Sequence, residues 1–120
     1  MRNPTTPLFC ELHAHTTWSD GSLSVRELVD LYGGAGFNVV AVTDHVVRPG
    51  ESQAGAVRAP TYDQYLDDLQ AEGERALATY GLLLVPGLEL TYDDADPRLV
   101  SPLARDRSVG CNAIRWASEW

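Results

Sequence analysis

Phe37-Asn38-Val39-Val40-Ala41-Val42-Thr43 lies in the first half of this 120-residue chain and is the segment from which its fold can be worked out. The run is almost continuously apolar, which is typical of a strand that is covered on both faces. Asp44 and His45 follow it directly. We therefore expect a buried strand whose carboxyl end carries polar side chains.

The sequence before this run predicts a strand and then a helix. Residues 8–14 are rich in apolar side chains and follow Pro7, so they predict a short first strand. Ser24 and Glu27 have the spacing of a capping box, in which each residue satisfies a backbone N–H of the other. We expect a helix to begin there and to end at the glycines of residues 33–36.

The sequence after the run repeats the pattern. Residues 46–60 are rich in Gly, Pro, Ser and Ala and predict a long loop. Thr61 with Gln64 forms a second capping-box pattern, and the helix that follows should stop at Gly81. Residues 82–90 then predict a third strand, interrupted by Pro86-Gly87. Strands that alternate with helices predict an α/β fold with parallel strands.

Composition excludes several classes of function. The net charge of −8 disfavours nucleic acid and anionic membranes as partners, although bound cations would weaken that repulsion locally. All nine basic residues are arginine, which suggests a bacterial, GC-rich source and excludes lysine chemistry. Cys10 and Cys111 are far apart, and we expect Cys10 to be a buried apolar residue. Without a signal-like or membrane-spanning segment, we expect a cytoplasmic protein.

The residues with metal-binding chemistry stand at the predicted strand ends. His13 and His15 are one residue apart, so both imidazoles should point to the same side of a strand. Functional side chains collect at the carboxyl ends of parallel strands, and a carboxylate such as Glu89 can bridge two cations. Singly, each residue has a plainer interpretation, and Asp20 before Gly21 resembles an ordinary turn pair. Their conjunction predicts a metal site with five ligands: His13, His15, Asp20, His45 and Glu89.

These residues lie in three ordered motifs that resemble those of the PHP (polymerase and histidinol phosphatase) family. The first is Glu11-Leu12-His13-Ala14-His15-Thr16 with Trp18-Ser19-Asp20-Gly21, the second is Val42-Thr43-Asp44-His45, and the third is Pro86-Gly87-Leu88-Glu89. The resemblance implies a distorted β/α barrel that binds two or three divalent ions of zinc, manganese or iron. It also implies hydrolysis of phosphoesters through attack by a metal-bound hydroxide.

The resemblance assigns a role to each position. His13 and His15 would bind one ion and share Glu89 with a second, while Asp20 and His45 would hold a further ion. Glu89 and His45 would therefore also be catalytic, and Asp44 would lie behind the ligands and orient them. From the sequence itself, we expect Arg48 to contact a phosphate, although a solvated loop arginine explains it equally well.

The chain departs from the family pattern in its last part. Glu11 stands where the family commonly has aspartate, and no histidine follows His45. We assign residues 1–93 to the amino-terminal part of a PHP domain and residues 94–120 to a divergent tail that reflects truncation or a frameshift after Val100. We expect the later strands of a full barrel to be missing, and three parallel strands would leave an unpaired sheet edge, through which the protein could form a homo-oligomer.

Three functions are consistent with these observations. The first is metal-dependent hydrolysis of a phosphomonoester or phosphodiester in a small phosphorylated substrate or nucleotide. The second is an incomplete, non-catalytic PHP domain that binds metal or a partner. The third is a deaminase or amidase of the amidohydrolase type, which also begins with a histidine pair. Many members of that group bridge their metals with a carbamylated lysine, and this chain contains no lysine.

Overall fold

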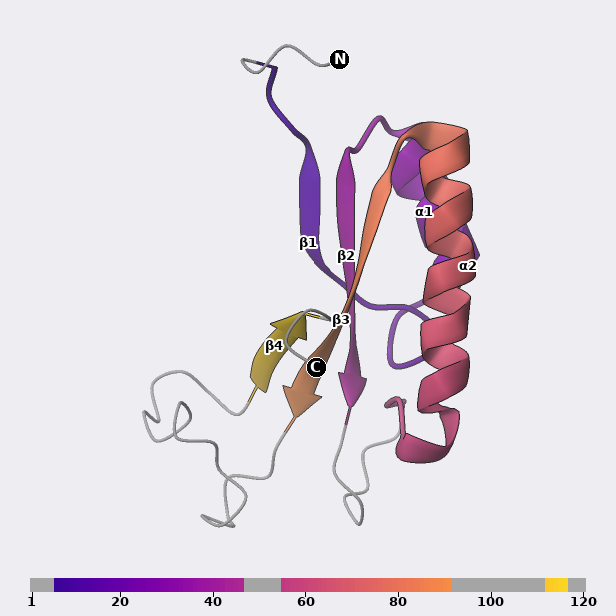
Figure 1. The fold of residues 1–120 in the computed structure, drawn as a ribbon. Helices are drawn as coiled ribbons and strands as arrows, with labels where there is room; N and C mark the ends of the chain where they lie inside the picture. Colours follow the sequence, from indigo (N-terminus) through magenta and orange to yellow (C-terminus); the bar gives the residue numbers. More distant parts are fainter. Residues whose placement is uncertain (1–5, 47–54, 92–111, 117–120) are drawn as a thin grey trace.

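The computed structural model describes residues 6–46, 55–91 and 112–116 (Figure 1). Strands and helices alternate through most of this range, as the sequence predicts. The elements are β1 (Cys10–Ala14), α1 (Val25–Gly34), β2 (Val39–Val46), a short 3₁₀ helix (Ala59–Thr61), α2 (Tyr62–Tyr80), β3 (Leu83–Thr91) and β4 (Asn112–Trp116).

The strands form one sheet in the order β1-β2-β3-β4. β1, β2 and β3 are parallel, which confirms the predicted α/β arrangement, and their carboxyl ends share one edge. β2 and β3 pair along their whole shared length, and His45 lies directly opposite Glu89. The strand pairing therefore places two of the predicted ligands side by side.

Both helices cover the same face of the sheet (Figure 1). Alternate strand residues point to this face, and Val40 and Val42 of β2 belong to one core cluster with Val29 of α1 and Leu69 of α2. Each fully buried aliphatic side chain contributes about 1.5–3 kcal/mol, so this layer holds the helices on the sheet. His45, which is out of phase with Val42, points to the opposite face.

The helix ends confirm one predicted cap and correct another. In α1, the Glu27 N–H donates to Ser24 Oγ at 3.1 Å and the Ser24 N–H donates to Glu27 Oε1 at 3.2 Å. The capping box predicted for Thr61 and Gln64 is wrong, because the Thr61 hydroxyl instead donates to the carbonyl of Arg58. α2 ends as predicted at Gly81, whose φ of 64° favours glycine.

Three expectations about the strands need correction. Pro86 does not interrupt β3: it pairs with Val42, and among the described residues the pairing of β3 with β4 begins only at Gly87, so proline sits on a free edge. Cys10 is exposed rather than buried, because β1 is an edge strand. The edge of β3 is not fully unpaired, since β4 lies antiparallel along its last part. Cys111 lies outside the described residues.

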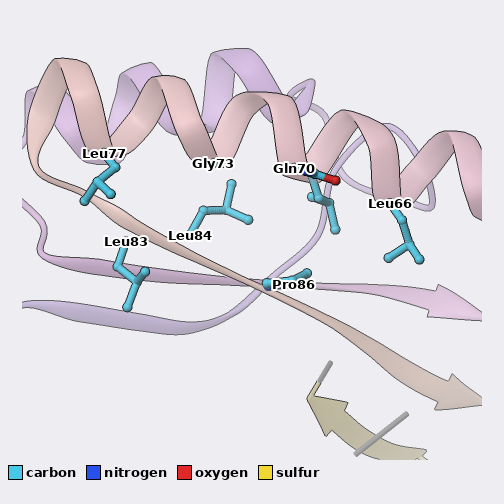
Figure 2. Close-up of a pocket in the computed structure, with 8 residues that line it drawn as sticks. Leu66, Gln70, Gly73, Leu77, Leu83, Leu84 and Pro86 are labelled. Atoms are coloured by element: carbon cyan, nitrogen blue, oxygen red, sulfur yellow. The ribbon is translucent and has the colours of Figure 1, made fainter. Parts of the chain in front are cut away.

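An apolar groove of about 460 Å³ lies between α2 and β3 (Figure 2). None of the predicted ligands borders it. Its lining includes Leu66, Leu69, Gln70, Gly73, Leu77, Leu83, Leu84 and Pro86. Among the helices in the described part of the chain, none has the length and apolar character needed to cross a membrane.

Candidate metal centre

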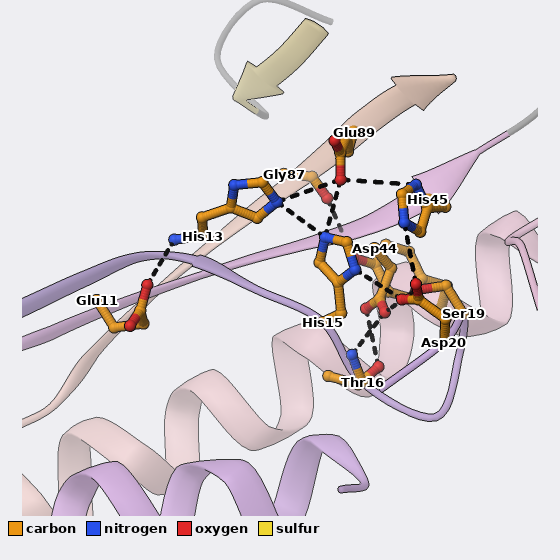
Figure 3. Close-up of polar contacts among 11 residues, drawn as sticks. Glu11, His13, His15, Thr16, Ser19, Asp20, Asp44, His45, Gly87 and Glu89 are labelled. Atoms are coloured by element: carbon orange, nitrogen blue, oxygen red, sulfur yellow. Dashed lines mark hydrogen bonds and ion pairs between the residues drawn. The ribbon is translucent and has the colours of Figure 1, made fainter. Parts of the chain in front are cut away.

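The carboxyl ends of β1, β2 and β3 bring imidazoles and carboxylates together (Figure 3). Each of the five residues predicted as a ligand takes part in this cluster. One lies near the end of β1, two lie in the loop after it, one lies near the end of β2 and one lies near the end of β3. They are His13, His15, Asp20, His45 and Glu89.

One part of the cluster joins the histidine pair to Glu89. His13 Nε2 and His15 Nε2 are 3.0 Å apart. Glu89 Oε2 lies 3.2 Å from the first and 2.9 Å from the second. The prediction that alternate residues direct both imidazoles to one side therefore matches the geometry, and the three ligand atoms converge on one small space.

A second part of the cluster joins Asp20 to two imidazoles. Asp20 Oδ1 lies 2.6 Å from His15 Nδ1, and Asp20 Oδ2 lies 3.2 Å from His45 Nε2. His45 Nδ1 is in turn 3.5 Å from Glu89 Oε2. These contacts close a ring that passes from Glu89 through His15, Asp20 and His45 back to Glu89.

The spacing fits divalent cations. Two ligands that each lie about 2.1 Å from one ion are about 3.0–3.4 Å apart at the usual coordination angles. The distances within the His13, His15 and Glu89 group fall at or slightly below this range, from 2.9 to 3.2 Å. Imidazole nitrogen and carboxylate oxygen are also ligands that Zn²⁺ and related ions accept. The residues therefore fit a metal site in both spacing and chemistry.

The members of the cluster differ in exposure. The Glu89 side chain is 7% exposed, whereas that of Asp20 is 53% exposed. A carboxylate as buried as Glu89 is costly unless it is paired, and the nearest nitrogens of three imidazoles lie within 3.5 Å of its Oε2. Burial raises the pKa of Asp20, but the hydrogen bond from His15 and the charges of His45 and His15 outweigh it and leave this pKa below its ordinary value.

Asp44 fixes the loop that carries Asp20. Its carboxylate is fully buried and accepts hydrogen bonds from the Thr16 N–H at 2.6 Å, the Thr16 hydroxyl at 2.8 Å and the Ser19 hydroxyl at 2.6 Å. Hydrogen bonds to a charged group contribute about 1.5–3 kcal/mol each, more than those between neutral groups. We call Asp44, Thr16 and Ser19 the loop clamp.

Two further contacts hold the same loop. The Trp18 indole N–H donates to Asp68 of α2 at 2.7 Å, and its ring meets that of Tyr65 edge-on. Gly21 lies so close to the residues that follow β1 that a Cβ atom there would overlap the backbone of His15. The requirement for glycine at this position is therefore steric.

Tyr65 supports the strand that carries Glu89. Its hydroxyl donates to the carbonyl of Gly87 at 3.0 Å, and the side chain is fully buried. Burial and the nearby Asp44 carboxylate raise the pKa of Tyr65 well above its ordinary value, so the hydroxyl stays protonated.

The structure adds detail to one prediction and does not test another. Asp44 was expected to orient the ligands, and its hydrogen bonds reach the loop at Thr16 and Ser19 rather than an imidazole ring. Arg48 lies outside the described residues, so its phosphate contact stays a prediction. Sequence reasoning missed Thr16 and Ser19. The available signal was the presence of two hydroxyl residues, Thr16 and Ser19, in the loop predicted to carry a ligand. Asp44 at the end of the next predicted strand is the acceptor that they would need.

Two known proteins resemble parts of this chain. No family model matches the chain. Over 90 residues, or 70% of this chain, it is 36% identical to the DNA polymerase/3'-5' exonuclease PolX of Bacillus subtilis, and it spans 15% of the length of that protein. The crystal structure of a Bifidobacterium adolescentis protein described as a metal-dependent phosphoesterase matches with a TM-score of 0.44. That match has 28% identity and covers 76% of this chain and 25% of the other.

The sequence match covers a large share of the chain, and the motifs supply the residues of the cluster. All three motifs occur in the expected order on β1, β2 and β3 and in the loop after β1. The chain thus contains the amino-terminal portion of a PHP-like domain.

Proposed function

We propose that this chain forms the metal-binding part of a PHP-type phosphoesterase. The observation that carries the proposal is the convergence of three imidazoles and two carboxylates at one edge of a parallel sheet. Paired divalent ions at such an edge are the usual means of hydrolysing phosphoesters. The sequence similarity to PolX supports this proposal for the part of PolX that the chain covers, which is 15% of its length.

The residues divide into two ligand groups. His13, His15 and Glu89 would hold the first cation, because their ligand atoms lie within 3.2 Å of one another. Asp20 and His45 would hold the second, with Glu89 between the two positions. When bound, the cations lower the pKa of water toward ~7 and neutralise charge on the phosphoryl oxygens.

The chain's own residues would position the reacting groups. Glu89 is nearly buried and contacts all three imidazoles, so it would fix the separation of the two cation positions. His45 lies opposite Glu89 in the strand register and would set the far side of the site. Arg48 follows shortly after His45 in sequence and is our candidate for contacting the substrate phosphate.

A small phosphorylated molecule or nucleotide is the substrate class that we favour. The net charge of −8 opposes binding of long nucleic acid by the chain as a whole. The name of PolX includes a 3'-5' exonuclease, an activity that breaks phosphodiester bonds. We therefore propose testing a phosphodiester and a phosphomonoester side by side.

Turnover of p-nitrophenyl phosphate and of bis-p-nitrophenyl phosphate, with added Mn²⁺ or Zn²⁺, tests the proposal. We expect metal-dependent hydrolysis of one of them, and a loss of at least about 100-fold in His13→Ala because a metal ligand is removed. Glu74→Gln is the control, since Glu74 is an exposed carboxylate on α2. Turnover unchanged in His13→Ala would refute the proposal.

A non-catalytic metal-binding module is the second candidate. All three histidines of the chain lie in the cluster, and within the described part of the chain two cations would share five protein ligands. Two zinc sites commonly use about four ligands each, and the remainder would have to come from water or another group. Uptake of metal without hydrolysis of either ester would favour this candidate.

A further inference from the structure

Both ring nitrogens of His15 are engaged in the cluster (Figure 3). Nε2 lies 3.0 Å from His13 Nε2 and 2.9 Å from Glu89 Oε2, at the first cation position. Nδ1 lies 2.6 Å from Asp20 Oδ1. The imidazole therefore stands between the first cation position and a carboxylate on the neighbouring loop.

The chemistry of imidazole limits what these two contacts can be. A neutral ring has one nitrogen with a lone pair and one that bears a proton. If Nε2 binds a cation, the proton must lie on Nδ1, and that N–H can donate to Asp20 Oδ1. Such a carboxylate behind a histidine ligand fixes the ring orientation and makes the nitrogen a better donor to the metal.

We propose that Asp20 is a positioning residue for His15, in addition to its proposed place as a ligand of the second cation. Its two oxygens serve the two tasks. Oδ1 faces His15 Nδ1, and Oδ2 lies 3.2 Å from His45 Nε2. The inference rests on the proposed function and adds that Asp20 links the two cation positions through one side chain.

The surrounding structure holds Asp20 ready for this role. The loop clamp and the close approach of Gly21 fix the backbone on both sides of Asp20. The side chain itself is 53% exposed, so replacing it does not leave a cavity in the core. Variants of Asp20 should therefore fold.

Asp20→Asn and Asp20→Ala form a matched pair that isolates the positioning role. Both remove the charge and the carboxylate ligand, but only asparagine keeps an oxygen that can accept the His15 N–H. We would titrate the full chain, freed of metal by a chelator, with Zn²⁺ in a calorimeter and determine the affinity for the first ion. Melting curves of the metal-free proteins would confirm that both variants fold.

We expect Asp20→Ala to bind the first Zn²⁺ about 10–100-fold more weakly than Asp20→Asn, as for other carboxylates behind histidine ligands. Both variants should lose the second ion. Equal affinity of the two variants for the first ion would overturn the positioning role.

The same titration separates this inference from the proposed function. Wild-type chain that binds no Zn²⁺ would contradict the proposed metal site itself. Wild-type chain that binds Zn²⁺, together with equal first-ion affinity in the two variants, would contradict the inference alone. Co²⁺ provides a second readout, because its visible spectrum responds to ligand orientation, and we expect Asp20→Asn to retain the wild-type first-ion spectrum and Asp20→Ala to alter it.

Discussion

The two sides of the metal centre are built in different ways. His45 and Glu89 lie opposite each other on neighbouring strands, and their side chains are only 12% and 7% exposed. Asp20 lies on a loop and is 53% exposed. Backbone hydrogen bonds of the sheet place the strand-borne ligands, whereas side-chain hydrogen bonds and a glycine place the loop-borne ligand. The loop side should therefore be easier to disturb without unfolding the sheet.

The largest effect should come from the strand side. Glu89→Gln keeps the shape of the side chain but removes the charge that all three imidazoles face. We expect affinity for the first cation to fall by more than about 100-fold, beyond the loss typical of groups behind the ligands. Zn²⁺ titration measures it, with Glu74→Gln as the control. Retained affinity would show that Glu89 is not a ligand.

A change of one methyl group tests how the loop is placed. Gly21→Ala introduces a Cβ that would overlap the backbone of His15, so the loop must move. We expect the free energy of unfolding to fall by about 3 kcal/mol, near the upper end for overpacking, and binding of the second cation to weaken.

Gly34→Ala is the matched control for the glycine change. Gly34 lies in α1, and a Cβ there would meet open space. We expect this substitution to stabilise the protein by about 0.5–1 kcal/mol, because alanine has a higher helix propensity than glycine. Urea denaturation compares the two variants. A Gly21→Ala protein as stable as wild type would contradict the steric account of the loop.

The loop clamp should show a graded effect. Asp44→Asn weakens hydrogen bonds to Thr16 and Ser19, and we expect a loss of about 2 kcal/mol in unfolding free energy. Ser19→Ala removes one of these bonds and should cost about 1.5 kcal/mol, at the low end for a hydrogen bond to a charged group. Asp67→Asn, an exposed carboxylate on α2, should change stability by less than about 0.5 kcal/mol. Equal stability of all three variants would show that the loop clamp does not stabilise the fold.

The smallest effect that we expect is a change in stability at acidic pH. Because the pKa of Asp20 is lowered in the folded chain, its ion pairs stabilise the fold above its ordinary pKa, and this contribution is lost as pH falls through the lowered value. In metal-free protein, the stability difference between wild type and Asp20→Asn should shrink as pH falls from about 5 to about 3. A difference that stays constant over this window would contradict the ion pairing.

Patterns local in sequence predicted most of the fold. The apolar run before Asp44 marks β2, and the Ser24 capping box marks the start of α1. The capping box expected at Thr61 failed because its hydroxyl had a nearer partner in Arg58. Burial of Cys10 failed because the order of the strands, which decides which one lies at the edge, is not written in any short segment.

The site was predictable to a similar extent. Histidines and carboxylates at the strand ends and in the loop after β1 identified all five members of the cluster, because parallel strands end at one edge. The loop clamp was not predictable, since Thr16 and Ser19 acquire their role only when the loop folds back onto Asp44 of another strand. Whether the cluster binds metal stays a prediction.

The metal content of the purified full chain tests the central claim most directly. After loading with Zn²⁺ or Mn²⁺ and extensive dialysis, elemental analysis should give two ions per wild-type chain and at most one per His13→Ala chain. A wild-type chain that retains no divalent ion would contradict a shared cation site at the carboxyl ends of β1, β2 and β3.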